Sequence, residues 1–206
     1  MSVEDLAKRF ARLATGAVVR RPALWRLFRG PLRFQFERLA PGWDARRTPD
    51  RVEAYEAALA ALPAPPRRAL DLGTGTGDGA FALAGRFPAA VVVGVDLAPA
   101  MVAEARRKTP PELRDKVTFA TADASRLPFR DDEFDLVAMN NMIPFFDELT
   151  RVVAPGGWAV FAFSGGAQTP IYVEPERLRR ELSRRGFAEF ADFSAGSGTA
   201  LAAKLH

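Results

Sequence analysis

The fold of this chain is decided by the stretch Ala69-Leu70-Asp71-Leu72-Gly73-Thr74-Gly75-Thr76-Gly77-Asp78-Gly79. An apolar run ends in a carboxylate and breaks at once into alternating glycines, and a helical pattern follows from Ala80 to Phe87. This order predicts a buried strand, a tight turn and a helix start. Glycine lacks Cβ, so the turn can take positive φ and lie bare against a ligand, and the helix start offers unpaired N–H groups. The stretch therefore indicates a nucleotide-type cofactor site at the carboxyl end of a first parallel strand.

Strand-like and helical segments alternate from Arg67 onward. The expected strands are 69–72, 90–95, 117–122, 134–139 and 158–163, and the expected helices are 77–87, 99–108, 145–153 and 175–185. Two last strands, 187–193 and 199–205, are joined by a loop with two glycines, which is typical of a hairpin. Alternating β and α elements predict an α/β, Rossmann-like, mainly parallel sheet with helices on both faces.

The first quarter of the chain has a different character. Residues 1 to about 50 are basic and aromatic, and helix-breaking residues interrupt them at Pro22, Gly30, Pro31, Pro41 and Pro49. We therefore expect short helices and turns there. Residues 51–62 have helical spacing and end at a proline-rich stretch that reads as a hinge. We therefore expect an N-terminal helical cap or lid over 1–62 and the α/β domain over 63–206.

Composition excludes several kinds of site. The chain of 206 residues has no cysteine, and its one histidine is His206. Disulfides, a thiol nucleophile, a histidine base and a metal site are therefore not expected. The first residues lack the features of a signal peptide and no run is long enough to span a membrane, so a cytoplasmic enzyme is expected.

The positive charge is concentrated near the N-terminus. Residues 1–51 carry 12 Lys and Arg against 5 Asp and Glu, whereas the rest carries 17 against 20. Such a segment is either an ordinary solvated helical face or a peripheral contact with a membrane surface. The arginines are scattered, so nucleic acid is not an expected partner. The sequence leaves the oligomeric state open.

Polar residues follow the later strands. Asp96 closes the second strand, Asp123 follows the third, and Asn140 and Asn141 follow the fourth. Because parallel strands end at one edge of a sheet, we expect these groups to line one ligand site. Asp96 has the position of a carboxylate that accepts from a ribose diol, and Asp123 that of an acceptor for an exocyclic amine. Each residue alone also fits a helix cap or an ordinary turn.

These motifs together resemble the class I S-adenosylmethionine-dependent methyltransferases, in particular their small-molecule, type 11-like branch. The resemblance covers about residues 67–163 and rests on the glycine turn, Val95-Asp96, Ala122-Asp123-Ala124, Phe129-Arg130-Asp131-Asp132-Glu133-Phe134-Asp135 and Pro155-Gly156-Gly157. The end of the chain resembles the family's terminal β-hairpin, which makes one strand antiparallel in a seven-stranded sheet. Phe36 to Asp44 resembles the segment before the core in quinone- and lipid-type members, where an aromatic residue, here Trp43, approaches the cofactor.

The resemblance implies S-adenosyl-L-methionine as the cofactor and a role for each matching residue. The glycine turn would lie along the methionine part of the cofactor, and Asp71 would help to hold its amino group. Asp96 would accept hydrogen bonds from the ribose hydroxyls. Asp123 would accept from adenine N6 beside the Ala124 backbone, and Leu97 and Met101 would pack against adenine or be plain core residues. The implied cofactor residues are Trp43, Asp71, Gly73, Thr74, Gly75, Gly77, Asp96, Leu97, Met101, Asp123, Ala124, Asn140 and Asn141.

The sequence does not assign a catalytic residue. Without a usable histidine, a base would be Asp147, Glu148, Tyr55, Tyr172 or the substrate itself. The acceptor pocket is expected to be apolar, with these aromatic and apolar side chains as candidates: Trp25, Phe28, Phe34, Phe36, Trp43, Ile143, Phe145 and Phe146. The predicted function is methyl transfer to a small, hydrophobic acceptor.

Two other functions remain open. The first is a non-catalytic partner protein that only binds S-adenosylmethionine. The second is an NAD(P)-dependent oxidoreductase, because Gly75 to Ala80 formally fits G-x-G-x-x-A. That fit begins after a first Asp and Gly, leaves Asp123 unexplained, and comes without a Tyr-Lys or His pair for hydride chemistry.

Overall fold

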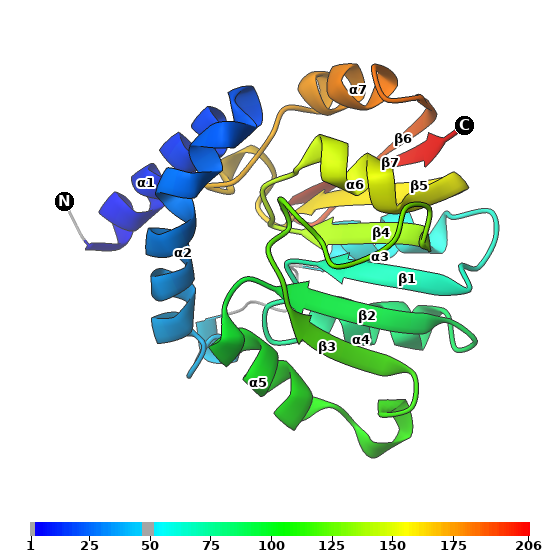
Figure 1. Ribbon diagram of the computed structural model, residues 1–206, viewed down its shortest axis with the longest axis horizontal. Coiled ribbons are helices and arrows are strands. Elements are labelled where there is room, and N and C mark those ends of the chain that lie inside the picture. The colour runs from blue at the N-terminus through cyan, green and yellow to red at the C-terminus, as the bar shows by residue number, and fades with distance from the viewer. Residues whose placement is uncertain (1–2, 47–51) are drawn as a thin grey trace.

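The computed structural model describes residues 3–46 and 52–206. Its centre is one seven-stranded sheet of order β3-β2-β1-β4-β5-β7-β6 (Figure 1). Every neighbouring pair from β3 to β5 is parallel, and β7 runs antiparallel to both β5 and β6. The strands are β1 Arg68–Leu72, β2 Val91–Asp96, β3 Val117–Thr121, β4 Phe134–Asn140, β5 Val153–Phe163, β6 Phe187–Ala195 and β7 Gly198–Leu205. The predicted fold class is confirmed, including the single reversed strand near the end.

Helices cover both faces of the sheet. They are α1 Val3–Arg20, α2 Trp25–Leu39, α3 Glu53–Ala60, α4 Asp78–Arg86, α5 Pro99–Lys108, α6 Phe146–Val152 and α7 Pro175–Ser183. Short 3₁₀ turns lie at Pro22–Leu24, Asp44–Arg46, Pro111–Leu113 and Gly166–Gln168. Figure 1 shows α1 and α2 standing across the edge where the parallel strands end, outside the layer that the other helices form.

Alternation along the strands divides the core into two parts. Leu70 and Leu72 of β1 join a cluster that contains α6 and α7 side chains such as Leu149 and Leu178, and it extends to the first two helices. Ala69 points to the other face and joins a cluster built by α3, α4 and α5. A strand places successive side chains on opposite faces, so both clusters form only if helices cover both sides.

The N-terminal region differs from the prediction of short helices. The structure has an 18-residue α1 and a 15-residue α2, and α2 continues through Gly30 and Pro31. A proline removes one backbone hydrogen bond and usually breaks a helix. Here Trp25 and Leu32, which flank the interruption, are both buried in the first core cluster, and this packing holds α2 in one piece.

The helix at the predicted domain boundary packs on the sheet. Tyr55, Ala58 and Leu59 of α3 are buried in the cluster that α4 and α5 share. The division at residues 62 and 63 therefore stays a prediction, and α3 itself covers one face of the α/β layer.

The start of β5 is also earlier than expected. The strand begins at Val153, which pairs with Phe134, and an irregularity follows before Leu136 pairs with Trp158. The turn Pro155-Gly156-Gly157 is thus an interruption inside one long strand. None of the described helices is long and apolar enough to cross a membrane. In residues 3–46 and 52–206 no group of three or more His, Cys, Asp or Glu is arranged to hold a metal ion.

Candidate functional site

The glycine turn lies at the carboxyl end of β1 and is held from β2. Gly73, Gly75 and Gly77 have φ values of +78°, +54° and +98°, in the region that only glycine enters without strain. The amides of Gly73 and Thr74 both donate to the Val95 carbonyl at 2.9 Å. Gly77 is the N-cap of α4. The predicted strand, turn and helix start are therefore present, and the turn carries no side chain at Gly73, Gly75 and Gly77.

Asp71 lies beneath this turn. It is 2% exposed, and its Oδ2 accepts the Thr74 hydroxyl at 2.5 Å. A Cβ on Gly79 would lie 2.6 Å from Asp71 Oδ1, so only glycine lets α4 begin directly over the carboxylate. These contacts hold the turn and the helix start together. The predicted contact of Asp71 with a ligand amino group stays a prediction.

Asp96 connects β2 to the same turn. Its Oδ2 accepts the Gly75 amide at 2.9 Å and its Oδ1 accepts the Ala98 amide at 2.8 Å. Burial raises the pKa of Asp96, and the backbone hydrogen bonds from Ala98, Gly75 and Leu97 only partly oppose this rise. The sequence placed a carboxylate at this strand end, and the structure brings it against the turn.

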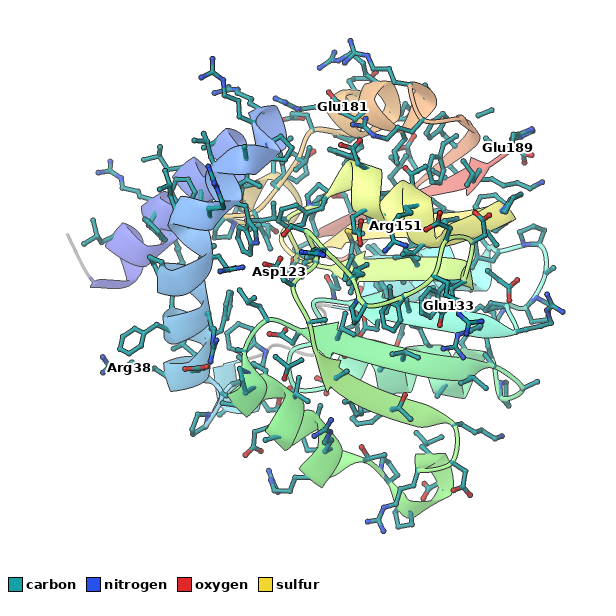
Figure 2. All side chains as sticks on the ribbon, viewed as in Figure 1. Arg38, Asp123, Glu133, Arg151, Glu181 and Glu189 are labelled. Carbon is teal, nitrogen blue, oxygen red and sulfur yellow. The ribbon has the colours of Figure 1, made fainter. Side chains whose placement is uncertain are left out.

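Asp123, after β3, accepts hydrogen bonds from three residues. Its Oδ1 accepts from Trp25 Nε1 at 2.8 Å, from the Ser125 amide at 2.9 Å and from the Ser125 hydroxyl at 2.7 Å. Its Oδ2 accepts from Arg29 at 3.2 Å. Burial raises the pKa of Asp123, but these hydrogen bonds outweigh burial, so the pKa lies below its usual value. Figure 2 shows Asp123 at the sheet edge, on the side toward α2.

The two asparagines after β4 have different surroundings. Asn140 Oδ1 is buried and has no hydrogen-bond partner among the described residues. Asn141 has a φ of +57°, and its side chain bonds Ser164 twice, from Nδ2 to Oγ at 2.8 Å and from the Ser164 amide to Oδ1 at 2.9 Å. Asn141 therefore closes the turn after β4 against β5. The unpartnered oxygen of Asn140 keeps its capacity to accept a hydrogen bond.

The segment after α2 is attached to the glycine turn. Thr76 donates its hydroxyl to Asp44 Oδ1 at 2.6 Å, and Lys108 Nζ lies 2.7 Å from Asp44 Oδ2 and 2.8 Å from Asp78 Oδ1. A Cβ on Gly75 would lie 3.7 Å from Trp43 Nε1. Trp43 is therefore beside the turn, and its approach to a cofactor stays a prediction.

The two apolar residues after β2 are packed rather than open. Met101 is 1% exposed and forms a small cluster with Ala40 and Ala98. Leu97 packs against the first core cluster, which Ala124 joins. A contact of Leu97 or Met101 with an adenine ring stays a prediction.

The aromatic candidates for an acceptor pocket divide into two groups. Trp25 meets the Phe145 ring edge-on at a centroid distance of 5.1 Å, and Phe36 meets Trp43 at 5.8 Å. Phe34, in contrast, is 61% exposed on α2, so its inclusion in the pocket is wrong. Trp25 and Leu32 are the buried residues of the same helix, and Phe34, two positions after Leu32, lies on its other side. The period of the helix thus places Phe34 on the exposed side of α2. The sequence pattern alone did not reveal which side of the helix faces the core.

The carboxylates considered as bases are engaged elsewhere. Asp147 pairs with Arg185, and Glu148 pairs with Arg151. Tyr55 is fully buried among α3 packing residues, and burial and Asp71 raise its pKa well above the usual value. Burial and Glu174 also raise the pKa of Tyr172. We therefore assign no base.

Sequence reasoning missed several residues of the site. A Cβ on Gly73 would lie 2.6 Å from Met142 Cγ, so the Met142 side chain rests on the bare turn. Four more residues hold predicted parts of the site through the bonds described above. Arg29 bonds Asp123, Ser164 bonds Asn141, and Asp44, which pairs with Lys108, bonds Thr76 of the turn. Asp44 ends the Phe36–Asp44 segment of the resemblance, which gave it no role. No motif signalled Arg29, Lys108 or Ser164, because each acts across a long separation in the chain.

The arrangement fits a nucleoside with a polar tail. Bare main chain, acids at two neighbouring strand ends and an unpartnered amide oxygen come together along one sheet edge. A sugar diol and an exocyclic amine are donors, and carboxylate and amide oxygens accept from them. This is the edge of the sheet at which open α/β folds bind nucleotide-type ligands.

Comparison with known proteins agrees with this geometry. Residues 69–157 match the family described as "Methyltransferase domain". A demethylmenaquinone methyltransferase of Thermus thermophilus is 50% identical over 105 residues, covering 47% of this chain and 47% of the relative. A malonyl-[acyl-carrier protein] O-methyltransferase of Halorhodospira halophila is 42% identical over 107 residues, covering 48% of this chain and 36% of the relative. The chain thus spans half or less of the length of these two relatives.

A solved structure gives the same result for the fold. A SAM-dependent methyltransferase from Aquifex aeolicus superposes with a TM-score of 0.67 at 18% identity, covering 81% of this chain and 98% of that one. At this identity the likeness concerns the arrangement of the elements.

Proposed function

We propose that this chain, whose residues 69–157 form a class I S-adenosylmethionine-dependent methyltransferase domain, transfers the methyl group of S-adenosyl-L-methionine to a small acceptor. The observation that carries the proposal is the junction of Asp96 with the Gly75 amide, which places a partly buried carboxylate beside the glycine turn. The same junction at the carboxyl edge of parallel strands suits a ribose next to a polar tail.

Each part of the cofactor has residues of suitable chemistry. Asp96 would accept from the ribose hydroxyls and Asp123 from the adenine amine. The methionine part would lie along Gly73 and Gly75, with Asn140 Oδ1 as an acceptor for its ammonium group. Met142 rests on Gly73 and would move aside, which its unbranched side chain allows.

The protein's contribution to the reaction is positioning. The bound cofactor supplies an electrophilic sulfonium methyl group. The chain orients an acceptor atom behind the S–CH₃ bond and excludes water, and such alignment is worth on the order of 7–11 kcal/mol in favourable intramolecular models. An acceptor that loses its proton easily needs no protein base, and none of the four candidate bases above is suitably free.

The acceptor is proposed to be hydrophobic. Trp25 and Phe145 form an edge-on pair beside Asp123, and Ile143 and Phe145 belong to the buried segment after β4. Apolar side chains of this kind line most small-molecule sites. A relative named for demethylmenaquinone has such an acceptor, and the proposal for this chain is limited to the chemical class.

Binding and transfer are tested separately. Titration calorimetry with S-adenosylhomocysteine and with NAD distinguishes the methyltransferase from an oxidoreductase, and binding of NAD alone would contradict the proposal. Incubation with methyl-labelled S-adenosylmethionine and a metabolite pool then tests transfer by mass shift. Tight cofactor binding without transfer to any acceptor would instead favour a non-catalytic binding protein.

We also propose that α1 and α2 form a lid that touches an anionic membrane surface. Leu13 and Leu27 are 70% and 69% exposed, Leu6 and Phe34 are 58% and 61% exposed, and residues 3–39 carry nine Lys and Arg against three Asp and Glu. Arg38 points outward from α2, away from the sheet (Figure 2). Exposed apolar side chains among cations are typical of helices that lie in a membrane interface.

Vesicle co-sedimentation tests this contact. We expect binding to phosphatidylcholine vesicles that contain phosphatidylglycerol and not to phosphatidylcholine alone. The double variant Leu13→Glu, Leu27→Glu should lose this binding. Val91→Glu, at a 43% exposed position on β2, serves as the matched control and should keep it. Equal binding of both variants would contradict the proposed surface.

A further inference from the structure

Helix α2 reaches Asp123 with two side chains. Trp25 Nε1 donates to Oδ1 at 2.8 Å across 98 positions of sequence, and Arg29 donates to Oδ2 at 3.2 Å across 94 positions. Both residues precede the segment 69–157 that matches the methyltransferase domain. The acid proposed to recognise adenine is therefore held by a helix outside that segment.

The two oxygens of Asp123 differ in their remaining capacity. Oδ1 accepts three hydrogen bonds, from Trp25 and from the amide and hydroxyl of Ser125. Oδ2 accepts one among the described residues, from Arg29, whose side chain is 55% exposed. A carboxylate oxygen has about two acceptor sites. Oδ2 can therefore accept an incoming amine while Trp25 keeps Oδ1 fixed.

Trp25 is itself firmly placed. It is 8% exposed, and its ring meets Phe145 edge-on with centroids 5.1 Å apart. The same side chain thus contacts the acid after β3 and the segment after β4. Neither contact requires the other to break, because one uses the indole N–H and the other uses the ring.

We propose that Trp25 is a positioning residue for adenine recognition, fixing Asp123 through Oδ1 so that Oδ2 receives the adenine 6-amino group. This inference rests on the proposed function, since it takes Asp123 as the adenine contact. Cofactor affinity then depends on α2 being docked. By linkage, a bound cofactor holds α2 and its aromatic side chains against Phe145, where the acceptor pocket is proposed.

The test compares two ligands that differ at the Watson–Crick edge of the base. S-adenosylhomocysteine carries the 6-amine and an unprotonated N1, whereas S-inosylhomocysteine carries an oxygen at position 6, which faces Oδ2 with like polarity, and a proton on N1. For the unaltered protein we expect calorimetry to show a preference of about tenfold or more for the amine. In Trp25→Phe, which keeps an aromatic ring, the preference should fall below about threefold.

Two features make the readout specific. The preference is a ratio within one protein, so a general loss of stability or affinity cancels from it. Trp158→Phe is the matched control, because Trp158 lies on β5, packs against the opposite core cluster, and has no hydrogen bond to Asp123. Trp158→Phe should keep the preference of the unaltered protein.

Each outcome bears on a different step. No binding of S-adenosylhomocysteine by the unaltered protein would overturn the proposed function and this inference with it. Equal binding of both ligands would overturn Asp123 as the adenine contact. A full preference in Trp25→Phe would overturn the role of Trp25 and leave the proposed function intact.

A measurement on the unaltered protein decides the matter if Trp25→Phe does not fold. The Trp25 indole N–H should stay protected from hydrogen exchange when S-adenosylhomocysteine binds, in ¹⁵N spectra assigned with Trp43→Phe and Trp158→Phe. Loss of protection on binding would mean that the ligand displaces Trp25, and the proposal would be wrong.

Discussion

Asp96 accepts a hydrogen bond from the Gly75 amide at 2.9 Å, so the acid that ends β2 holds the turn that follows β1. The other oxygen of Asp96 accepts from the Ala98 amide, at the start of α5. Two motifs that the sequence presents separately are thus one structural unit. A ligand that approaches the turn meets the main chain and the carboxylate together.

Asp96 should make cofactor affinity depend on pH. Burial raises its pKa, so Asp96 takes up a proton at a higher pH than an exposed aspartate. A protonated carboxyl accepts ribose hydroxyls poorly, so the affinity for S-adenosylhomocysteine should fall as the pH falls through this raised pKa. Asp123, whose pKa is lowered, stays ionised over the same range.

Calorimetry at a series of pH values checks this, with Asp96→Asn as the comparison. The variant should bind at least about tenfold more weakly near neutrality, because a charged acceptor is lost, and its affinity should not change over the acid range. An equally steep pH dependence in Asp96→Asn would show that another group titrates.

Gly75→Val should remove cofactor binding while the protein stays folded. Its φ of +54° strains any branched residue, and the new side chain would extend from the turn toward Trp43. We expect a stability loss of about 1–2 kcal/mol and no detectable S-adenosylhomocysteine binding. Gly156→Val is the control, because Gly156 has a φ of +77° and open space around its Cβ position. It should show a similar strain and unaltered binding.

Two glycines of α4 should respond in opposite ways to alanine. A Cβ on Gly79 would lie 2.6 Å from the buried Asp71 carboxylate, whereas one on Gly85 would meet nothing within 4 Å. Gly79→Ala should therefore destabilise the protein by about 1–3 kcal/mol. Gly85→Ala should stabilise it by about 0.5–1 kcal/mol, because alanine is the better helix former. Urea unfolding of both variants gives the comparison, and equal midpoints would contradict the crowding at Asp71.

Substitutions at the turn after β4 should follow a fixed order. Asn141→Ala loses both bonds to Ser164 and keeps the φ of +57°, so it should lose about 2–3 kcal/mol. Asn141→Gly loses the same bonds without strain and should be about 1 kcal/mol more stable than the alanine variant. Ser164→Ala loses only the hydroxyl and should be least affected. Thermal unfolding in which Asn141→Gly is no better than Asn141→Ala would remove the argument from backbone strain.

Much of the α/β layer could be predicted because its signals are local. Glycines after an apolar strand, β-branched runs such as Val91–Val95, and Pro99 at a helix start depend on a few neighbouring residues. The prediction failed for α2, where Gly30 and Pro31 suggested a break. There the buried positions of Trp25 and Leu32 outweighed the local preference, and burial depends on the whole molecule.

The sequence by itself determined the order of strands and helices, the positive-φ turn, and the presence of acids at strand ends. These follow from side-chain period and from the conformations that glycine allows. Only the tertiary structure decided which groups those acids meet: Trp25 and Arg29 for Asp123, Gly75 for Asp96, and Ser164 for Asn141. The physical reason is that a hydrogen bond acts over about 3 Å whatever the separation along the chain, so distant partners appear only once the sheet has brought them to one edge.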